Sequence, residues 1–288
     1  MKKKGVFIIV FVIFFNSLYA QNVSDFDIQV HDNGTVTILN YKGPGGEITI
    51  PEHIFNMPVI EIKGGTYRGS LSGGAFHGKN LTKVTILAKI TIIEVNTFAS
   101  NQITSVTLPE TLESIEDNAF ARNRLTSITI PENVEYIGNS AFASNQIISI
   151  TIPGKVKIIG DNAFNGNPIR ESITIPDSVI LIGSSAFQGN YDYNNNNRIT
   201  SIVLGNSVRY IGSYAFNGHR AASIIIPDSV GYIGDSAFSS NNNSLTTITI
   251  GRYIKLEGRT SFGYDFIYYI RMSGVYSLIN NNWVFTQN

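Results

Sequence analysis

The sequence predicts a β-rich solenoid of about nine 22-residue repeats, with parallel stacked strands joined by short helical turns. Phenylalanine recurs at a nearly constant spacing, and a short apolar and polar phrase recurs in phase with it. A period of this length is typical of stacked repeat architectures, in which no single copy encloses its own apolar face. The recurring phenylalanines are Phe76, Phe98, Phe120, Phe142, Phe164, Phe187, Phe216, Phe238 and Phe262.

Each repeat opens with a predicted strand and a proline that ends it. Residues 127–130 alternate polar side chains with β-branched apolar ones, which suits a half-buried strand. Pro131 follows, and proline has no N–H to donate to a ladder. The outward positions are mostly serine and threonine, which predicts two columns of hydroxyls along one face. Such columns fit a partner surface and also fit a solvated strand, so both interpretations stay open.

The second half of each repeat predicts a bend, a helical turn and a buried amide. Gly138 is expected to relieve a tight bend, and the dipeptide at 139–140 resembles a helix N-cap before a turn at 141–142. A polar residue three positions after each phenylalanine predicts an internal amide ladder that satisfies backbone groups. The ladder positions are Asn101, Asn123, Asn145, Asn167, Asn190, His219 and Asn241.

The whole phrase, L-x-x-I-x-I-P-x-x-V-x-x-I-G-x-x-A-F-x-x-N, resembles the BspA-like, Treponema-type leucine-rich repeats over about residues 47–262. Leu87 and Gly251 depart from the proline position, and Glu94 and Glu116 depart from the glycine position. The resemblance implies a leucine-rich-repeat solenoid that adheres to host or matrix proteins or to other bacteria.

The N-terminus predicts export. Three lysines at residues 2–4 precede an apolar stretch at 6–15, and small residues follow near Ala20. This order is that of a secretory signal peptide, here residues 1–20. Cysteine is absent, so disulfides and thiolate metal sites are excluded. We therefore expect a secreted, periplasmic or cell-surface protein with no membrane span after the signal is removed.

Both ends of the repeat array are expected to carry caps. Residues 21–46 lack the repeat, and Asp32-Asn33-Gly34 lies between two alternating stretches, which predicts an N-terminal capping β-hairpin. The solenoid then occupies residues 47–262. Residues 263–288 alternate aromatic and β-branched side chains, and they are expected to form a C-terminal β cap.

Composition and motifs argue against catalysis and nucleic-acid binding. Lys+Arg and Asp+Glu are both 21, and no basic cluster outside the signal forms a nucleic-acid footprint. The four histidines occupy unrelated repeat positions, so no metal-ligand spacing emerges. No serine lies in a nucleophile-elbow context, and no glycine-rich segment has the lysine of a phosphate loop. We expect no catalytic residue, no metal and no cofactor.

Insertions point to one candidate binding surface. Three of them fall at the corner between the ladder position and the next strand, and the largest covers residues 191–197. Insertions in solenoids map to loops on one face, which is often the binding face, although asparagine-rich loops are also simply tolerated there. Two outward aliphatic residues make an apolar spot near this loop. The candidate partner-binding residues are Tyr191, Tyr193, Arg198, Ser201, Val203, Ser223 and Ile225.

The sequence thus favours a non-catalytic binding module that is secreted or displayed on the cell surface. We expect it to be monomeric and to bind a host-matrix or cell-surface protein, with a glycan as the second choice of partner. One alternative is a passive envelope or antigen protein whose repeats act as a spacer. Another is a β-helix enzyme acting on polysaccharides. That enzyme requires an acidic Ca²⁺ cluster or a basic catalytic residue on one coil face, and no coil carries such a concentration.

Overall fold

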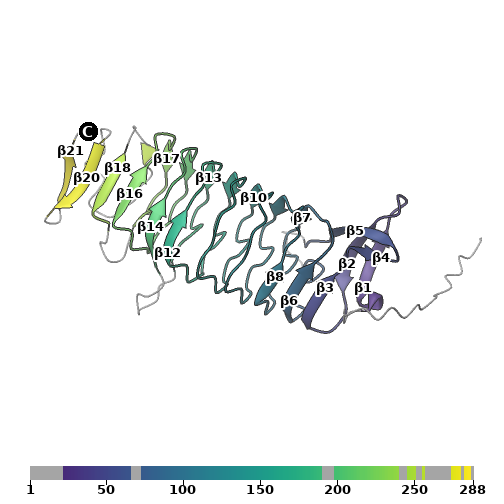
Figure 1. The fold of residues 1–288 in the computed structure, drawn as a ribbon. Helices are drawn as coiled ribbons and strands as arrows, with labels where there is room; N and C mark the ends of the chain where they lie inside the picture. Colours follow the sequence, from purple (N-terminus) through teal and green to yellow (C-terminus); the bar gives the residue numbers. More distant parts are fainter. Residues whose placement is uncertain are drawn as a thin grey trace, which may run out of the picture.

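The computed structural model describes residues 22–65, 73–189, 198–239, 245–250, 255–256, 274–279 and 282–286. These residues form an elongated stack of coils that runs from the N-terminal strands to the C-terminal ones (Figure 1). Within them, the 3₁₀ turn η1 (Val23–Asp25) is the sole helical element. The predicted β-rich solenoid of parallel stacked strands is confirmed. The expected signal peptide and Phe262 lie outside the described residues.

One face of the stack is an eight-stranded parallel sheet to which each coil contributes a two-residue strand. The strands follow one another coil by coil without a change of order, so residues one repeat apart lie directly opposite each other. The strands are β7 (Ile92–Ile93), β9 (Ser114–Ile115), β10 (Tyr136–Ile137), β11 (Ile158–Ile159), β13 (Leu181–Ile182), β15 (Tyr210–Ile211), β17 (Tyr232–Ile233) and β19 (Lys255–Leu256).

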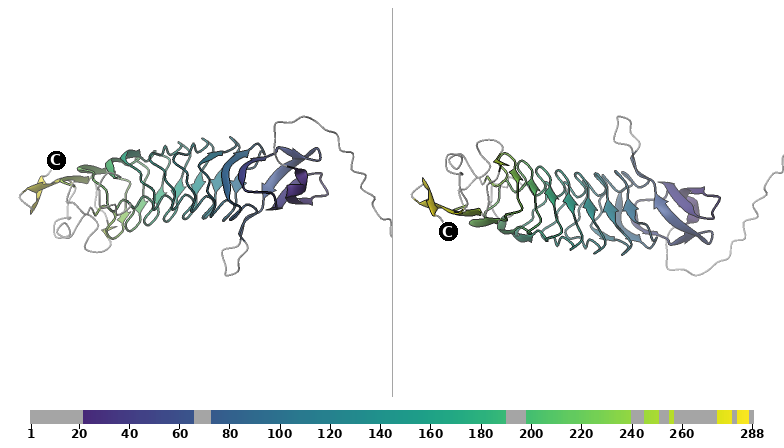
Figure 2. Two further views of the ribbon diagram at one scale, coloured as in Figure 1. Left: turned by 90° about the horizontal axis from the view of Figure 1, so that it is seen from below. Right: turned by 90° about the horizontal axis from the view of Figure 1, so that it is seen from above.

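A second face carries the longer strands, which run in three separate ladders (Figure 2). Between β8 and β12, residues 127–130 and 149–152 continue this face without forming strands. At the C-terminal end, β20 (Gly274–Ile279) pairs antiparallel with β18, and β21 (Asn282–Thr286) pairs antiparallel with β20. The parallel strands are β3 (Gly46–Ile50), β6 (Leu81–Ile86), β8 (Ser105–Thr107), β12 (Glu171–Thr174), β14 (Ile199–Val203), β16 (Ser223–Ile226) and β18 (Thr247–Ile250).

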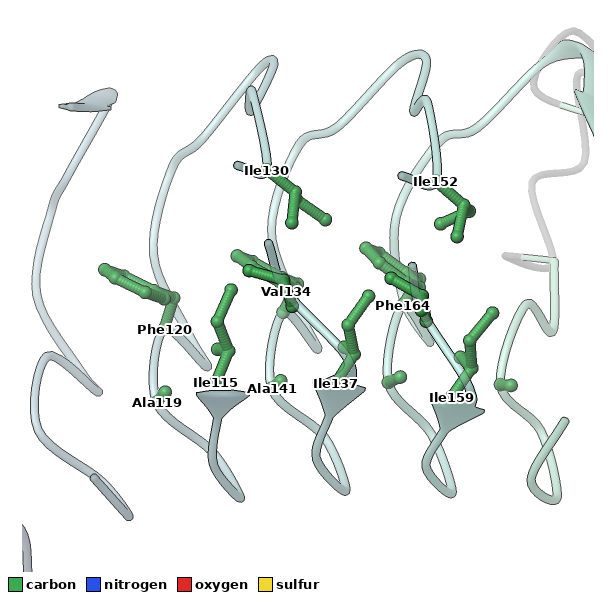
Figure 3. Close-up of a cluster of buried hydrophobic side chains, with 14 of the residues drawn as sticks. Ile115, Ala119, Phe120, Ile130, Val134, Ile137, Ala141, Ile152, Ile159 and Phe164 are labelled. Atoms are coloured by element: carbon green, nitrogen blue, oxygen red, sulfur yellow. The ribbon is translucent and has the colours of Figure 1, made fainter. Parts of the chain in front are cut away.

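The core is a set of columns made from equivalent residues of successive coils (Figure 3). Phe120, Phe142 and Phe164 are almost fully buried, and neighbouring ring centroids lie 5.6 and 5.4 Å apart with planes 4° and 8° from parallel. The same stacking continues from Phe76 to Phe238. Because each ring contacts the ring before and after it, one coil completes the core of the next.

The N-terminal strands close one end of this column. β1 (Phe26–Val30) and β2 (Val36–Tyr41) form an antiparallel pair, and β5 (Met57–Ile62) joins β2 in parallel and carries β4 (His53–Ile54) at its edge. Tyr41 is buried, and its ring centroid lies 5.5 Å from that of Phe76. The aromatic column therefore runs on into the first strands of the chain.

The predicted amide ladder is present in the coils that the structure describes. Asn145 is buried, and its Oδ1 accepts the N–H of Leu125 at 3.1 Å. Its Nδ2 donates to the carbonyls of Phe120 and Phe142 at 2.9 and 3.0 Å. The same bonds recur at Asn101, Asn123 and Asn167. Asn190 and Asn241 lie outside the described residues.

The expected helical turn and its N-cap are replaced by a different arrangement. The N–H of Ala141 donates to the carbonyl of Gly138, and the N–H of Ala143 donates to that of Ser140, which makes two successive turns. Ser140 has φ 55°. The side chain of Asn139 caps no helix: its Oδ1 accepts the N–H of Asp161 in the next coil at 2.8 Å. Local spacing suggested a cap, but the bond runs between coils.

The glycine before this turn is explained by contact between coils and not by a bend. The φ angle of Gly138 is not positive, so its backbone does not adopt the left-handed conformation that favours glycine. A Cβ built on it would lie 2.6 Å from both the N atom of Asp117 and the C atom of Glu116 in the preceding coil. The expectation that this glycine relieves a tight bend is therefore wrong, because close approach of neighbouring backbones is what excludes a side chain.

Candidate functional site

Four of the residues predicted to bind a partner lie together on the longer-stranded face. Val203 in β14 and Ile225 in β16 point outward and are 52% and 68% exposed. Ser201 and Ser223 are exposed on the same two strands. We call these four residues the aliphatic patch. Thr174 pairs with Val203 in the ladder, so the patch interrupts a hydroxyl column.

Of the other three predicted residues, the structure describes only Arg198. Arg198 is only 7% exposed, although the sequence placed it beside an exposed loop. This burial leaves little of the side chain available to a partner, and a binding role for Arg198 stays a prediction. Tyr191 and Tyr193 lie outside the residues that the structure describes.

A second surface, which sequence reasoning missed, lies on the eight-stranded sheet. Its outward position in each coil is the residue just before the inward isoleucine, and from β10 to β17 this residue is tyrosine, isoleucine or leucine. The ladder register places these residues directly opposite one another, coil after coil. We call this row the tyrosine ridge; it consists of Tyr136, Ile158, Leu181, Tyr210 and Tyr232.

The ridge side chains are partly exposed, and two of the tyrosine rings stack on each other. Ile158 is 38% and Tyr210 is 36% exposed, and the rest of the ridge is half-buried. The ring centroids of Tyr210 and Tyr232 lie 4.5 Å apart with planes 4° from parallel. One face of each ring therefore rests on the other ring. Ile180, the residue before Leu181, is exposed too and widens the apolar surface.

Tyr214 adds a strained and exposed aromatic to the same coil as Tyr210. It is exposed and has φ 60°, in the left-handed region that a bulky residue rarely adopts. In six other coils this turn position holds asparagine or serine, which adopt such a conformation more readily than tyrosine does. The equivalent residues are Asn96, Asn118, Ser140, Asn162, Ser185 and Ser236. A costly residue retained on the surface points to a role outside folding.

Charged side chains flank the first residues of the ridge. The Glu135 carboxylate and the Lys157 ammonium form an ion pair at 2.6 Å beside Tyr136 and Ile158, and each partner is about half exposed. Burial, together with the nearby carboxylates of Asp117 and Glu116, raises the pKa of Tyr136. Its phenol therefore stays protonated at neutral pH and serves as a hydrogen-bond donor and acceptor.

Potential metal ligands are scattered over the described coils. Within the part of the chain that the structure describes, no group of three or more His, Asp or Glu side chains converges as metal ligands. His219 is deeply buried in the amide ladder, where Nδ1 accepts the Ile199 N–H and Nε2 donates to the Phe187 carbonyl. Among the same residues, no helix has the length and apolar character needed to cross a membrane.

The sequence of the repeats matches the profile of a known protein family. The profile of the BspA-type leucine-rich-repeat region, in six copies, matches residues 69–194 and 189–287. The chain belongs to the BspA-type leucine-rich-repeat family. None of the curated proteins matches it.

Solved structures of other bacterial leucine-rich-repeat proteins resemble this BspA-type solenoid at low identity. The leucine-rich-repeat protein of T. pallidum is 18% identical, with 79% of this chain and 80% of that one covered and a TM-score of 0.39. A leucine-rich cell-surface protein of Faecalibacterium prausnitzii is 18% identical, with 87% of this chain and 99% of that one covered and a TM-score of 0.36. The pneumococcal vaccine antigen PcpA is 18% identical, with 83% of this chain and 77% of that one covered and a TM-score of 0.47.

The BspA-type repeat explains the core but not the ridge. In the recurring phrase V-x-x-I-G, the ridge position is the second x, so the fold of the coil does not require an apolar residue there. Ser114 occupies it in β9 without disturbing the ladder with β10. Tyr136, Tyr210 and Tyr232 recur at this position, and that recurrence is the sequence signal by which the ridge could have been found.

Proposed function

We propose that the chain is an exported, non-catalytic scaffold that binds a partner protein through the tyrosine ridge. The observation that carries this proposal is a continuous row of large apolar side chains, partly exposed at a repeat position where the fold needs none. The basic and apolar N-terminal segment supports export to a compartment where such a partner is met.

The chemistry of the ridge suits a protein partner. Tyrosine and isoleucine side chains supply large contact areas, and interface hot spots are enriched in tyrosine. The ridge is held by a repetitive backbone, so little conformational entropy is lost when a partner binds. Because the faces of Tyr210 and Tyr232 stack on each other, these rings are less available as platforms for a sugar.

The aliphatic patch is a second candidate surface for the same function. Ile225 and Val203 are more exposed than any ridge residue, and the insertion at 191–197 leads directly into the strand that carries Val203. We include Tyr191 and Tyr193 in this candidate surface. The patch is smaller, since only two aliphatic side chains interrupt the surrounding hydroxyls.

Substitution at Tyr214 and Tyr210 tests the ridge without damaging the core. Tyr214→Asn relieves the strained backbone, so we expect the melting temperature to rise while affinity for the partner falls. Tyr210→Ser removes a ridge ring, and we expect a loss of about tenfold or more in affinity, typical of a hot-spot tyrosine. Surface plasmon resonance against a panel of purified matrix and cell-surface proteins supplies the partner and the affinities.

Ile225→Ser tests the aliphatic patch, and it should leave affinity unchanged if the ridge is the binding surface. If Ile225→Ser weakens binding and Tyr210→Ser does not, the aliphatic patch and not the ridge is the binding surface. Failure of the chain to bind any protein in the panel, at concentrations up to about millimolar, would contradict the binding function and favour a spacer role.

A further inference from the structure

The two ends of the solenoid expose their outermost strands differently. At the N-terminal end the sheet order is β1-β2-β5-β4, so β1 and β4 are its edges. At the C-terminal end the order is β16-β18-β20-β21, so β21 is the outer edge. A strand edge presents unpaired N–H and C=O groups and can pair with another chain unless the protein blocks it.

The N-terminal edges carry blocking features. β1 contains a bulge between Asp27 and Ile28, which disturbs the regular spacing of its backbone groups. The Asp27 carboxylate also forms an ion pair with Lys42 at 2.6 Å, so charge lies on this strand. β4 has only two residues. Bulges, charges and short length are the usual means by which edge strands avoid pairing.

The C-terminal edge has none of these features. β21 pairs with β20 over five consecutive residue pairs without a register shift. Its sequence, Asn-Trp-Val-Phe-Thr, contains no charged residue and no proline, and it is rich in residues that favour strands. Figure 1 places β21 at the extreme end of the stack, and among the described residues no strand pairs with its outer edge.

We infer that β21 is a pairing edge and that its occupant is β21 of a second copy, aligned antiparallel. An antiparallel self-pair over the five residues places Val284 opposite Val284 and Trp283 opposite Phe285. No like charges face each other, since the strand has none. The contact is isologous, so pairing closes at two copies.

A self-pair is favoured over head-to-tail growth. Pairing β21 with β1 of another copy would leave a free β21 on that copy and generate an open filament. The bulge and the Asp27–Lys42 ion pair of β1 oppose that contact. Two copies joined through β21 instead form one longer rod with both N-terminal ends outermost. This inference departs from the monomer expected from the sequence and does not depend on the ridge.

Sedimentation equilibrium of the purified full chain over a range of concentrations tests the pairing. We expect the mass to rise from that of a monomer to twice that value. Val284→Lys and Val284→Glu each place like charges opposite one another, and each should weaken the self-association by about fivefold or more. An equimolar mixture of the two variants should restore pairing, because opposite charges then meet at the centre of the strand pair.

Thr107→Lys adds the same charge to an exposed position of β8, which lies in a different sheet from β21, and should leave the self-association unchanged. Thermal unfolding followed by circular dichroism shows whether each variant keeps its solenoid. A chain that stays monomeric at every concentration overturns the inference. Pairing that survives Val284→Lys, or a mixture of the two charged variants that fails to pair, overturns it as well.

Discussion

His219 shows how one residue of a different chemistry fits the amide ladder. The imidazole Nδ1 accepts the N–H of Ile199 at 3.2 Å, as the Oδ1 of asparagine does in other coils. Nε2 donates to the Phe187 carbonyl, as the amide nitrogen does. This pair of roles fixes the neutral tautomer with its proton on Nε2. Burial lowers the pKa of His219 to about 4, and the nearby positive charge of Arg198 adds to this effect.

The lowered pKa predicts a loss of stability in acid. Between pH 6.5 and 4 the unfolded chain binds a proton at this site that the folded chain does not, so stability falls as pH drops through this window. The loss reaches up to about 3 kcal/mol. His219→Asn keeps the ladder bonds and should abolish this component of the pH dependence, as measured by urea unfolding at several pH values.

His53→Asn, at an exposed position, is the control and should leave the dependence in place. A wild-type unfolding midpoint with the same pH profile as His219→Asn would contradict the lowered pKa of His219.

The glycines that precede the turn give a second prediction at this scale. A Cβ on Gly183 would lie 2.4 Å from the N atom of Asp161 and 2.5 Å from the C atom of Gly160. We expect Gly183→Ala to cost about 1–3 kcal/mol through overpacking between coils. Gly154 has no atom within 4 Å of its Cβ direction, so Gly154→Ala should be neutral or stabilise by up to about 1 kcal/mol. Equal urea midpoints for the two variants would refute the close-approach explanation.

At the scale of the element, the phenylalanine column is the feature that joins one coil to the next. Phe142 is fully buried, and its ring packs between those of Phe120 and Phe164. Backbone hydrogen bonds also run between the coils, and burial of the stacked rings adds an apolar contribution to the cohesion between them.

Removing one ring from the column should therefore be costly. We expect Phe142→Ala to lower the free energy of unfolding by about 3–5 kcal/mol, because the neighbouring rings cannot close the cavity. Ile148→Ala removes an apolar side chain from the exposed surface and serves as the control, with an expected change below about 1 kcal/mol. Unfolding of Phe142→Ala at the wild-type denaturant concentration would contradict a packed column.

At the scale of the whole molecule, stacking places the outward side chains of successive coils in rows along the rod. The tyrosine ridge is such a row and extends from β10 to β17. The same geometry leaves two ends that cannot be alike, because one begins with a bulged and charged strand and the other finishes with a regular, uncharged one. The proposed partner surface therefore lies along the side of the rod, and the proposed self-pairing lies at its tip.

The repeat period alone determined the solenoid, the buried phenylalanines and the amide ladder. Each coil packs on residues one repeat away, so the same residue types are needed at the same position of every repeat. The sequence therefore repeats with the period of the coil. Phe142 and Asn145 could be assigned to the interior because the phenylalanine returns in every copy and the asparagine in six of the nine.

Only the tertiary structure decided which surface residues are exposed together and what holds the turns. Arg198 is buried, and the side chain of Asn139 bonds to the next coil and not to its own turn. At position 138 the backbone of Asp117 leaves no room for a side chain larger than that of glycine. These outcomes depend on the distance and register between coils, which a periodic pattern does not encode. For the same reason, the tyrosine ridge became visible only when the ladder placed its members opposite one another.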